Sequence, residues 1–397
     1  MEIYQDEFYK GFQGDSEYDA MKQIQLELES HSEWERGISD FAVTALDNPM
    51  EVEIRMLEPT NTIPKEILLD TADNAGIMLV YEGREVCLRS CALPSLAATA
   101  NISGTGISKA EKTKLAIGLT AFLSTARRNS QVLTRAGKVA AIVSADYEWM
   151  PISLLLNVCD NLQNQFGKAK FIGGSVSHSL TVAQYEYPEV SDAITDAYNS
   201  VLIAHGHSAT KSLVPVIEFR ASDTTGEAAK LLTYLKSGSI LYPLGGFKVV
   251  HIPPREYHDN GLRFTCMDKF EAEANTLFSK MEYDITDSLP RMLQTKIDHP
   301  GNCFVGLCGY ANIPQKWGGR IEEEIRANYP DGSECCFLDI YEALASVTAL
   351  AQEDGYESYS QRVLDLEEGI CKVLRNRASW KKYDLPGTVA WSSAKAA

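Results

Sequence analysis

The chain has 397 residues, of which 45% are hydrophobic, and a formal net charge of −17. This length and composition are sufficient for one large or two ordinary globular domains, and the excess of carboxylates argues against a nonspecific nucleic-acid binder. No stretch reaches the 18 or more uninterrupted apolar residues of a membrane span, and the first residues lack the basic start and apolar run of a signal peptide. We therefore expect a cytoplasmic protein, in a cell or an infected host, with no membrane partner.

The charges are sorted along the sequence. Residues 1–75 contain 18 acidic and 5 basic side chains, a net charge of −13, whereas residues 76–140 contain 3 acidic and 9 basic ones, a net charge of +6. One interpretation is a solvated surface on which charges happen to cluster. The other is a basic binding face that an acidic N-terminal arm, residues 1–60, partly masks. Residues 1–48 would be either docked on another surface, for example that of a neighbouring subunit, or partly disordered.

The first part of the chain combines strand and helix patterns. Residues 50–56 alternate apolar and charged side chains, which is typical of a half-buried strand. A short helix is expected to begin at Pro64. Residues 77–81 and 85–88 flank a glycine turn and predict a hairpin. A helix is expected at residues 92–101. A second helix is expected from a capping box at Ser108 and Glu111 to about residue 126, and the lysines and arginines along it and just after it supply much of the basic excess.

The clearest pattern lies between residues 131 and 187. Residues 131–135 and 138–144 are rich in Val, Leu and Ile and flank Ala136-Gly137, which predicts a tight hairpin. A helix beginning at Pro151 follows. Two strands come next, with a bend or bulge expected at the glycine pair Gly173-Gly174.

The rest of the chain completes an α+β pattern. Residues 190–204 predict a helix, 214–219 and 240–252 predict strands, and 228–235 are strand or helix. Five helices are then expected, at residues 264–280, 285–297, 318–327, 337–351 and 359–375. We predict an α+β fold with a mostly antiparallel sheet, helices packed on it and a helical C-terminal third. Its parts are the arm 1–60, an α+β core 61–262, a helical region 263–383 and a loose tail 384–397.

The sequence predicts neither a metal site nor a cofactor. The nine cysteines are odd in number and irregularly spaced, so reduced cysteines in the core are favoured over disulfides, and zinc is the less favoured alternative. The spacings Cys87/Cys91 and Cys303/Cys308 do not match a C-x2-C pair. Residues 102–106 are rich in glycine but lack the phosphate-loop and dinucleotide patterns.

Three motifs resemble a phage and plasmid protein group, domain-of-unknown-function family 932. They are VLTRAGKVAAIVSADYEW, VIEFRASDTTGEAAKL and FLDIYEALASVTALAQ. The resemblance covers about residues 65–377 and implies an origin in a mobile element or virus, beside recombination and replication accessories. It supplies no catalytic residues. The family often carries basic residues where this chain has Ala140, Ala141, Ala145 and Asp146, which leaves few cations in the first motif.

Our first functional hypothesis is a non-enzymatic phage or plasmid protein that binds or anneals single-stranded DNA, as a homo-oligomer, in recombination or replication. The candidate contacts are the cations Lys109, Lys112, Lys114, Arg127, Arg128, Arg135 and Lys138 and the aromatic residues Tyr147 and Trp149. The simpler interpretation of each aromatic residue is packing in the core. The alternatives are a structural protein of a virion or shell, and an inhibitor that binds a host defence protein. No catalytic motif is found.

Overall fold

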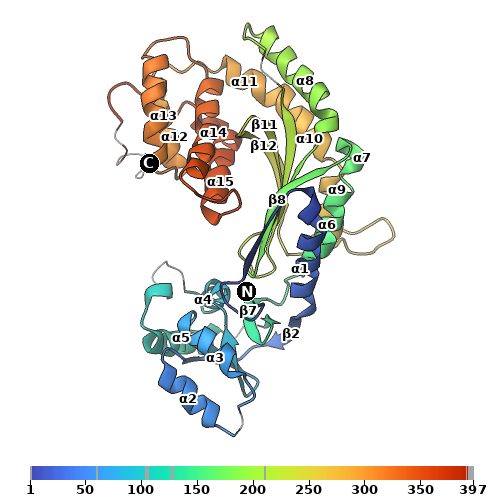
Figure 1. Ribbon diagram of the computed structural model, residues 1–397, viewed down its shortest axis with the longest axis vertical. Helices are drawn as coiled ribbons and strands as arrows, with labels where there is room; N and C mark the ends of the chain where they lie inside the picture. Colours follow the sequence, from blue (N-terminus) through green and yellow to red (C-terminus); the bar gives the residue numbers. More distant parts are fainter. Residues whose placement is uncertain are drawn as a thin grey trace.

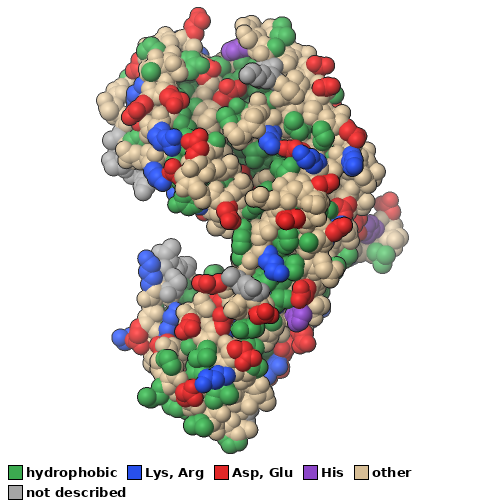
Figure 2. All heavy atoms as spheres, viewed as in Figure 1, with side chains coloured by type: hydrophobic (Ala, Val, Ile, Leu, Met, Phe, Trp, Pro, Cys, Tyr) green, Lys and Arg blue, Asp and Glu red, His purple; other side chains and the backbone are tan. Residues whose placement is uncertain are grey.

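The computed structural model describes residues 2–59, 61–102, 107–126, 129–209, 212–389 and 391, with Ser108 described for its backbone alone. It contains two six-stranded sheets in two lobes that are separated by a notch (Figures 1 and 2). We call them the small lobe, residues 32–144, and the large lobe, residues 9–30 and 147–389. The predicted α+β fold, with mostly antiparallel pairing and a helical C-terminal third, is confirmed.

The small lobe is built on sheet B, whose strand order is β2-β6-β7-β5-β4-β3. Its strands are β2 (Ser32–Ile38), β3 (Ala42–Ala45), β4 (Ile77–Tyr81), β5 (Arg84–Leu88), β6 (Ser130–Arg135) and β7 (Lys138–Ser144). Its helices are α2 (Pro49–Leu57), α3 (Lys65–Asp73), α4 (Leu93–Thr99) and α5 (Lys112–Ala126). The pair β5–β7 is the one parallel pair among the described strands. Both predicted hairpins, β4–β5 and β6–β7, are confirmed.

The large lobe is built on sheet A, an antiparallel sheet with the order β1-β8-β9-β10-β11-β12. Its strands are β1 (Tyr9–Gln13), β8 (Lys170–Ser177), β9 (Thr181–Glu186), β10 (Val214–Ala221), β11 (Ala229–Ser237) and β12 (Ile240–Val249). The register shifts between Phe171 and Gly173, so the predicted bulge is present. Residues 228–235, for which strand and helix were both open, form a strand.

Helices cover both faces of sheet A (Figure 1). The first face packs on α1 (Tyr18–Ser30), α6 (Ile152–Asp160), α7 (Gln163–Phe166), α8 (Ser191–Ala204), α9 (Cys266–Ala274) and α10 (Leu277–Tyr283). On the opposite side lie α11 (Leu289–Gln294), α12 (Pro300–Tyr310), α13 (Gln315–Asn328), α14 (Phe337–Glu353) and α15 (Gln361–Arg375). These C-terminal helices share a separate hydrophobic core. A π-helical turn (Asp284–Ser288) joins α10 to α11. Helices α14 and α15 contact β12.

Short 3-10 turns complete the elements. They are η1 (Asp15–Glu17), η2 (Ser90–Ala92), η3 (Ile107–Lys109), η4 (Pro188–Val190) and η6 (Arg377–Ser379). None of the helices that the structure describes is long and apolar enough to cross a lipid bilayer. Eight of the nine cysteines are buried, as the core interpretation expects, and Cys91 is partly exposed.

The first 60 residues do not form a separate arm. Strand β1 pairs with β8 of sheet A, while β2 and β3 pair with β6 and β4 of sheet B. Met21 and Leu28 of α1 are buried in the core of the large lobe. Strand pairing with both sheets and the burial of these apolar residues of α1 thus dock this acidic segment. Deleting the segment would remove strands from both sheets.

Two local predictions are wrong. Residues 50–56 belong to helix α2 and not to a strand, because Asn48 caps the helix by accepting the backbone N–H of Glu51 at 3.0 Å and Pro49 begins it. Helix α12 was missed because glycine and proline in its sequence resemble a joint. Its Gly306 allows the ring of Tyr383 to pack against the helix backbone.

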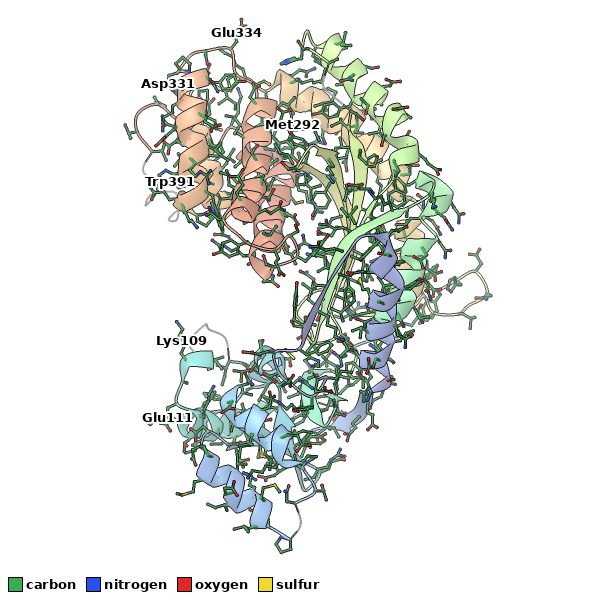
Figure 3. The ribbon with its side chains drawn as sticks, viewed as in Figure 1. Lys109, Glu111, Met292, Asp331, Glu334 and Trp391 are labelled. Atoms are coloured by element: carbon green, nitrogen blue, oxygen red, sulfur yellow. The ribbon has the colours of Figure 1, made fainter. Side chains whose placement is uncertain are left out.

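The predicted loose tail is partly docked. Asn302 of α12 donates to the carbonyls of Leu385 at 2.7 Å and Gly387 at 2.6 Å. Trp391, which Figure 3 labels beside the C-terminal helices, donates its indole N–H to Glu322 at 2.7 Å. The chain therefore divides into two sheet lobes with the C-terminal helices on the large one, and not into arm, core, helical region and tail.

Candidate binding site: the sheet pocket

Three of the cations that we predicted to contact DNA lie on the surface of the small lobe: Lys109, Lys112 and Lys114. Lys109 is exposed and projects toward the notch (Figure 3). Lys114 is also exposed and forms an ion pair with Glu111 at 2.9 Å. Arg127 and Arg128 lie outside the described residues. The basic surface that the structure describes here is a small one.

The prediction that Arg135 and Lys138 contact DNA is wrong. Their exposed fractions are 1% and 0%. Arg135 forms an ion pair with Asp223, and Lys138 forms one with Asp70. A phosphate would reach either cation only by breaking a buried pair, which leaves a carboxylate uncompensated. Both residues are buried because the ends of β6 and β7 lie at the junction between the two lobes.

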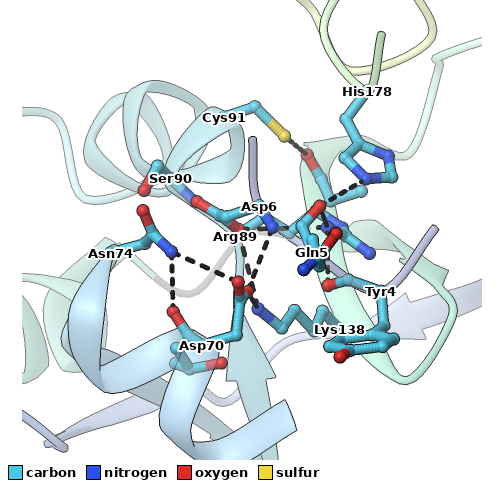
Figure 4. Close-up of polar contacts among 12 residues, drawn as sticks. Tyr4, Gln5, Asp6, Asp70, Asn74, Arg89, Ser90, Cys91, Lys138 and His178 are labelled. Atoms are coloured by element: carbon cyan, nitrogen blue, oxygen red, sulfur yellow. Dashed lines mark hydrogen bonds and ion pairs between the residues drawn. The ribbon is translucent and has the colours of Figure 1, made fainter. Parts of the chain in front are cut away.

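These two cations belong to a larger junction cluster, of which Figure 4 labels Lys138, Arg89, Asp6 and Asp70. It consists of three cations and three carboxylates: Arg89, Arg135, Lys138, Asp6, Asp70 and Asp223. Arg89 donates to the backbone carbonyls of Ile3 and Gln5, each at 3.0 Å. The side chain of Asp6 accepts the backbone N–H of Ser90 at 2.9 Å. The cluster thereby fixes the N-terminal segment between the lobes, and its charges balance.

Tyr147 and Trp149 are half-buried in an aromatic cluster at the same junction. The ring of Tyr147 stacks on Trp34 at 5.3 Å and on His251 at 4.8 Å between centroids. The ring of Trp149 lies 6.4 Å from that of Trp34. The packing interpretation therefore describes both residues, and stacking of Tyr147 on a base would compete with the contacts that it already makes.

A cavity of about 1020 Å³ lies on the face of sheet A that is turned toward α14 and α15, and we call it the sheet pocket. Its lining comes from the first 17 residues, from sheet A and its β11–β12 turn, from α14 and α15, and from the loop between these two helices. The residues are Tyr9, Gly11, Phe12, Gln13, Glu17, Ile172, Gln184, Lys236, Gly238, Ser239, Leu241, Gln352, Tyr356, Glu357, Ser358, Tyr359 and Glu367. Segments from both ends of the chain thus meet at this site.

Gln184 and Glu367 belong to a buried polar group that we call the floor cluster. Its members are Gln184, Glu218, Arg220, Tyr234 and Glu367, and each is at most 4% exposed. Arg220 pairs with Glu218 through Nε and donates from Nη2 to Glu367 at 2.6 Å. Gln184 donates its amide N–H to Glu218. The hydroxyl of Tyr234 lies 3.3 Å from Glu218 and 3.4 Å from Glu367. Strands β9, β10 and β11 and helix α15 place these groups together.

The floor cluster has two carboxylates for one guanidinium. Burial, together with the negative charge of Glu218, raises the pKa of Glu367 well above its usual range, and Arg220 opposes this shift. The cluster therefore either keeps a proton or has an uncompensated negative charge. Buried ionic groups stabilise a fold no better than apolar residues of similar volume, so a cluster of this kind beside a cavity is a candidate functional site.

The rim of the sheet pocket adds to the negative charge. Glu17 and Glu357 are exposed at the rim. Lys236, a cation of the pocket lining, forms an ion pair with Glu186 at the end of β9, two strands away in the sheet. Tyr9 donates its hydroxyl to Glu357 at 3.0 Å, which ties β1 to the loop after α14.

Aromatic side chains form the walls of the pocket. Tyr9 and Tyr356 are 39% and 42% exposed, and Tyr359 is half-buried. Gly173 of β8 makes room for Tyr359, because a Cβ at this position would overlap the Tyr359 hydroxyl and lie 2.8 Å from the carbonyl of Phe12. Desolvation, followed by the charges of Glu218 and Glu367, raises the pKa of Tyr359. Tyr359 therefore remains neutral at physiological pH.

The sequence alone did not indicate this site. A charged residue within the apolar pattern of β10, Glu218 followed two positions later by Arg220, was the available signal, since alternate residues of a strand share a face. Among the described residues, no three potential ligands from His, Cys, Asp and Glu are grouped so that they could hold a metal ion. Searches of protein-family models, curated proteins and solved structures found no match to this chain. The resemblance to family 932 stays a prediction.

Proposed function

We propose that this protein is a non-enzymatic binding protein that holds a cationic group, an alkylammonium or a guanidinium, in the sheet pocket. The observation that carries the proposal is the floor cluster, with two carboxylates for one guanidinium, at the base of an open cavity. In the unliganded protein the raised pKa of Glu367 favours a proton there; a ligand cation would displace this proton and supply the positive charge in its place. The cation would be partly desolvated at this site, where an ion pair is stronger than in water.

The aromatic walls support the same ligand class. Tyr9, Tyr356 and Tyr359 line the pocket, and cations are attracted to the negative face of an aromatic ring. A phosphate is disfavoured, because Glu17, Glu357 and Glu367 all border the cavity. A basic side chain of a partner protein and a free polyamine share the required chemistry. A basic side chain of a partner protein would agree with the alternative hypothesis of the sequence analysis, an inhibitor that binds a host defence protein.

Calorimetric titration of the intact protein with spermidine and with a hexa-arginine peptide tests the proposal. Binding of either probe, weakened at least tenfold in Glu357→Gln, is the expected result, because one exposed carboxylate of the rim is removed. Glu334→Gln is the matched control, since Glu334 is an exposed carboxylate away from the pocket (Figure 3). Binding of the peptide alone would indicate a protein partner, and binding of spermidine alone a polyamine. No binding, or equal weakening in both variants, would refute the proposal.

Single-stranded DNA binding or annealing, with homo-oligomers, is the second candidate. The observation that favours it is the group of surface lysines Lys109, Lys112 and Lys114 on the small lobe, of which Lys109 projects toward the notch (Figure 3). If these lysines contact phosphates, affinity for an oligonucleotide falls steeply with salt, and replacing them with glutamine lowers the slope by about 0.7 for each contact that is lost. Fluorescence anisotropy measures both effects. An affinity that does not depend on salt would remove this candidate.

A further inference from the structure

A second cavity, of about 510 Å³, lies at the junction between the lobes, and we call it the junction pocket. It is separate from the sheet pocket and does not depend on the function proposed there. Its lining is contributed by α4, by the facing ends of β6 and β7, by the β10–β11 turn and by residues 250–252. Apolar side chains dominate the walls: Ala98, Ile142, Val143, Ala228, Val250 and Ile252.

One buried polar atom in this lining has no hydrogen-bond partner. His251 is 7% exposed, and its Nδ1 lies 3.2 Å from the carbonyl oxygen of Glu148. A carbonyl only accepts, so Nδ1 carries the proton in the neutral ring and Nε2 presents a lone pair. Nε2 is buried and unpartnered. Leaving a buried acceptor unsatisfied costs free energy, which a ligand with a donor group would recover.

The orientation of His251 is fixed by its surroundings. Its ring stacks on Tyr147 with an interplanar angle of 4° and a centroid distance of 4.8 Å. Burial lowers the pKa of His251, so the ring stays neutral and Nε2 remains an acceptor at physiological pH. The lining of the pocket therefore includes a histidine whose ring is held in one orientation and whose Nε2 is an acceptor without a partner.

The charges around the junction pocket are already paired. Glu227 is the one carboxylate among the described residues of the lining, and Lys230 forms an ion pair with it at 3.0 Å. Among the lining residues that the structure describes, a charged ligand would find no free counter-charge, and it would be desolvated at a cost. An uncharged ligand with an apolar body matches the walls.

We propose that the junction pocket binds a small, uncharged, mainly apolar compound that donates one N–H or O–H hydrogen bond to Nε2 of His251. An aromatic N–H compound such as indole has this chemistry and serves as a probe. The ligand would contact both lobes, because α4 and β7 belong to the small lobe and His251 to the large one.

The experiment compares indole with 1-methylindole, which has the same apolar body but no donor. Calorimetry or ligand-observed NMR on the intact wild-type protein should show indole binding about tenfold more tightly, the factor expected for one hydrogen bond. His251→Asn retains a donor for the carbonyl of Glu148 and removes the Nε2 acceptor. In this variant the two compounds should bind with equal, weaker affinity. His31→Asn, at an exposed histidine, is the control.

The ligand pair keeps the proposal testable if His251→Asn does not fold, because the comparison then rests on the wild-type protein alone. Equal affinity of the wild type for both compounds, or no binding of either, would overturn the proposal. Retention of the preference for indole in a folded His251→Asn variant would also overturn it.

Discussion

The junction cluster and the floor cluster are both buried groups of charges, yet they differ in balance and in surroundings. The junction cluster pairs three cations with three carboxylates between the lobes. The floor cluster has two carboxylates for one guanidinium and borders the sheet pocket. A balanced, enclosed cluster positions parts of the chain, whereas an unbalanced one beside a cavity can recognise a ligand. We therefore assign a structural role to the junction cluster, and we propose a ligand-binding role for the floor cluster.

Removing one partner from the junction cluster should have the largest effect. Arg135→Met leaves Asp223 buried without its cation and should lower the free energy of unfolding by about 3–5 kcal/mol. Chemical denaturation measures the loss, and Lys114→Met, at an exposed pair, should leave stability unchanged within error. The double variant Arg135→Met/Asp223→Asn should recover part of the loss. An Arg135→Met protein as stable as the wild type would contradict the architectural role.

Filling the space beside Tyr359 tests whether the sheet pocket needs its present shape. Gly173→Ala places a methyl group where the Tyr359 hydroxyl lies, so we expect a loss of about 1–3 kcal/mol of stability together with loss of cation binding. Denaturation and calorimetry check the two results. Gly118→Ala, in α5 with open space around it, is the control and should be neutral or stabilising. Unchanged cation binding in Gly173→Ala would show that the position of Tyr359 does not matter for cation binding.

The junction cluster should also make stability depend on pH through His178. Burial and the charges of Arg89 and Arg135 lower the pKa of His178 to about 2. The unfolded chain therefore takes up a proton below about pH 6.5 that the native protein does not bind, and stability falls as pH decreases from 6.5, by at most about 1.4 kcal/mol per pH unit. Denaturation at several pH values should give a flatter profile for His178→Gln. Identical profiles would exclude this contribution.

Replacing the excess carboxylate of the floor cluster should have the smallest effect on stability. Because the pKa of Glu367 is raised, the native protein holds a proton that the unfolded chain loses, and stability falls as pH rises above the usual carboxyl range. Glu367→Gln should remove this decline, leave stability near pH 7 unchanged or higher, and abolish cation binding. A large loss of stability in Glu367→Gln would instead give the floor cluster the same architectural role as the junction cluster.

Local patterns were predictable wherever neighbouring residues decide the structure. The hairpin β6–β7 followed from two apolar runs and the Ala136-Gly137 turn, and the long C-terminal helices followed from apolar residues spaced three and four apart. Residues 50–56 were mistaken for a strand because Val52 and Met56 suit either period, and the cap at Asn48 decided for the helix. A short amphipathic segment is ambiguous until a partner surface selects its buried face.

The roles of individual charges were not predictable in this way. Arg135 and Lys138 stand in the basic part of the sequence, but carboxylates distant in the chain, Asp223 and Asp70, bury them in ion pairs. The sheet pocket likewise joins Tyr9 to Glu357 across 348 positions. The sequence by itself determined the α+β class, most of the elements and the sorting of charge along the chain. The tertiary structure alone decided which charges face solvent, which neutralise one another and which border a cavity, because electrostatic partners are set by distance in space and not by order along the chain.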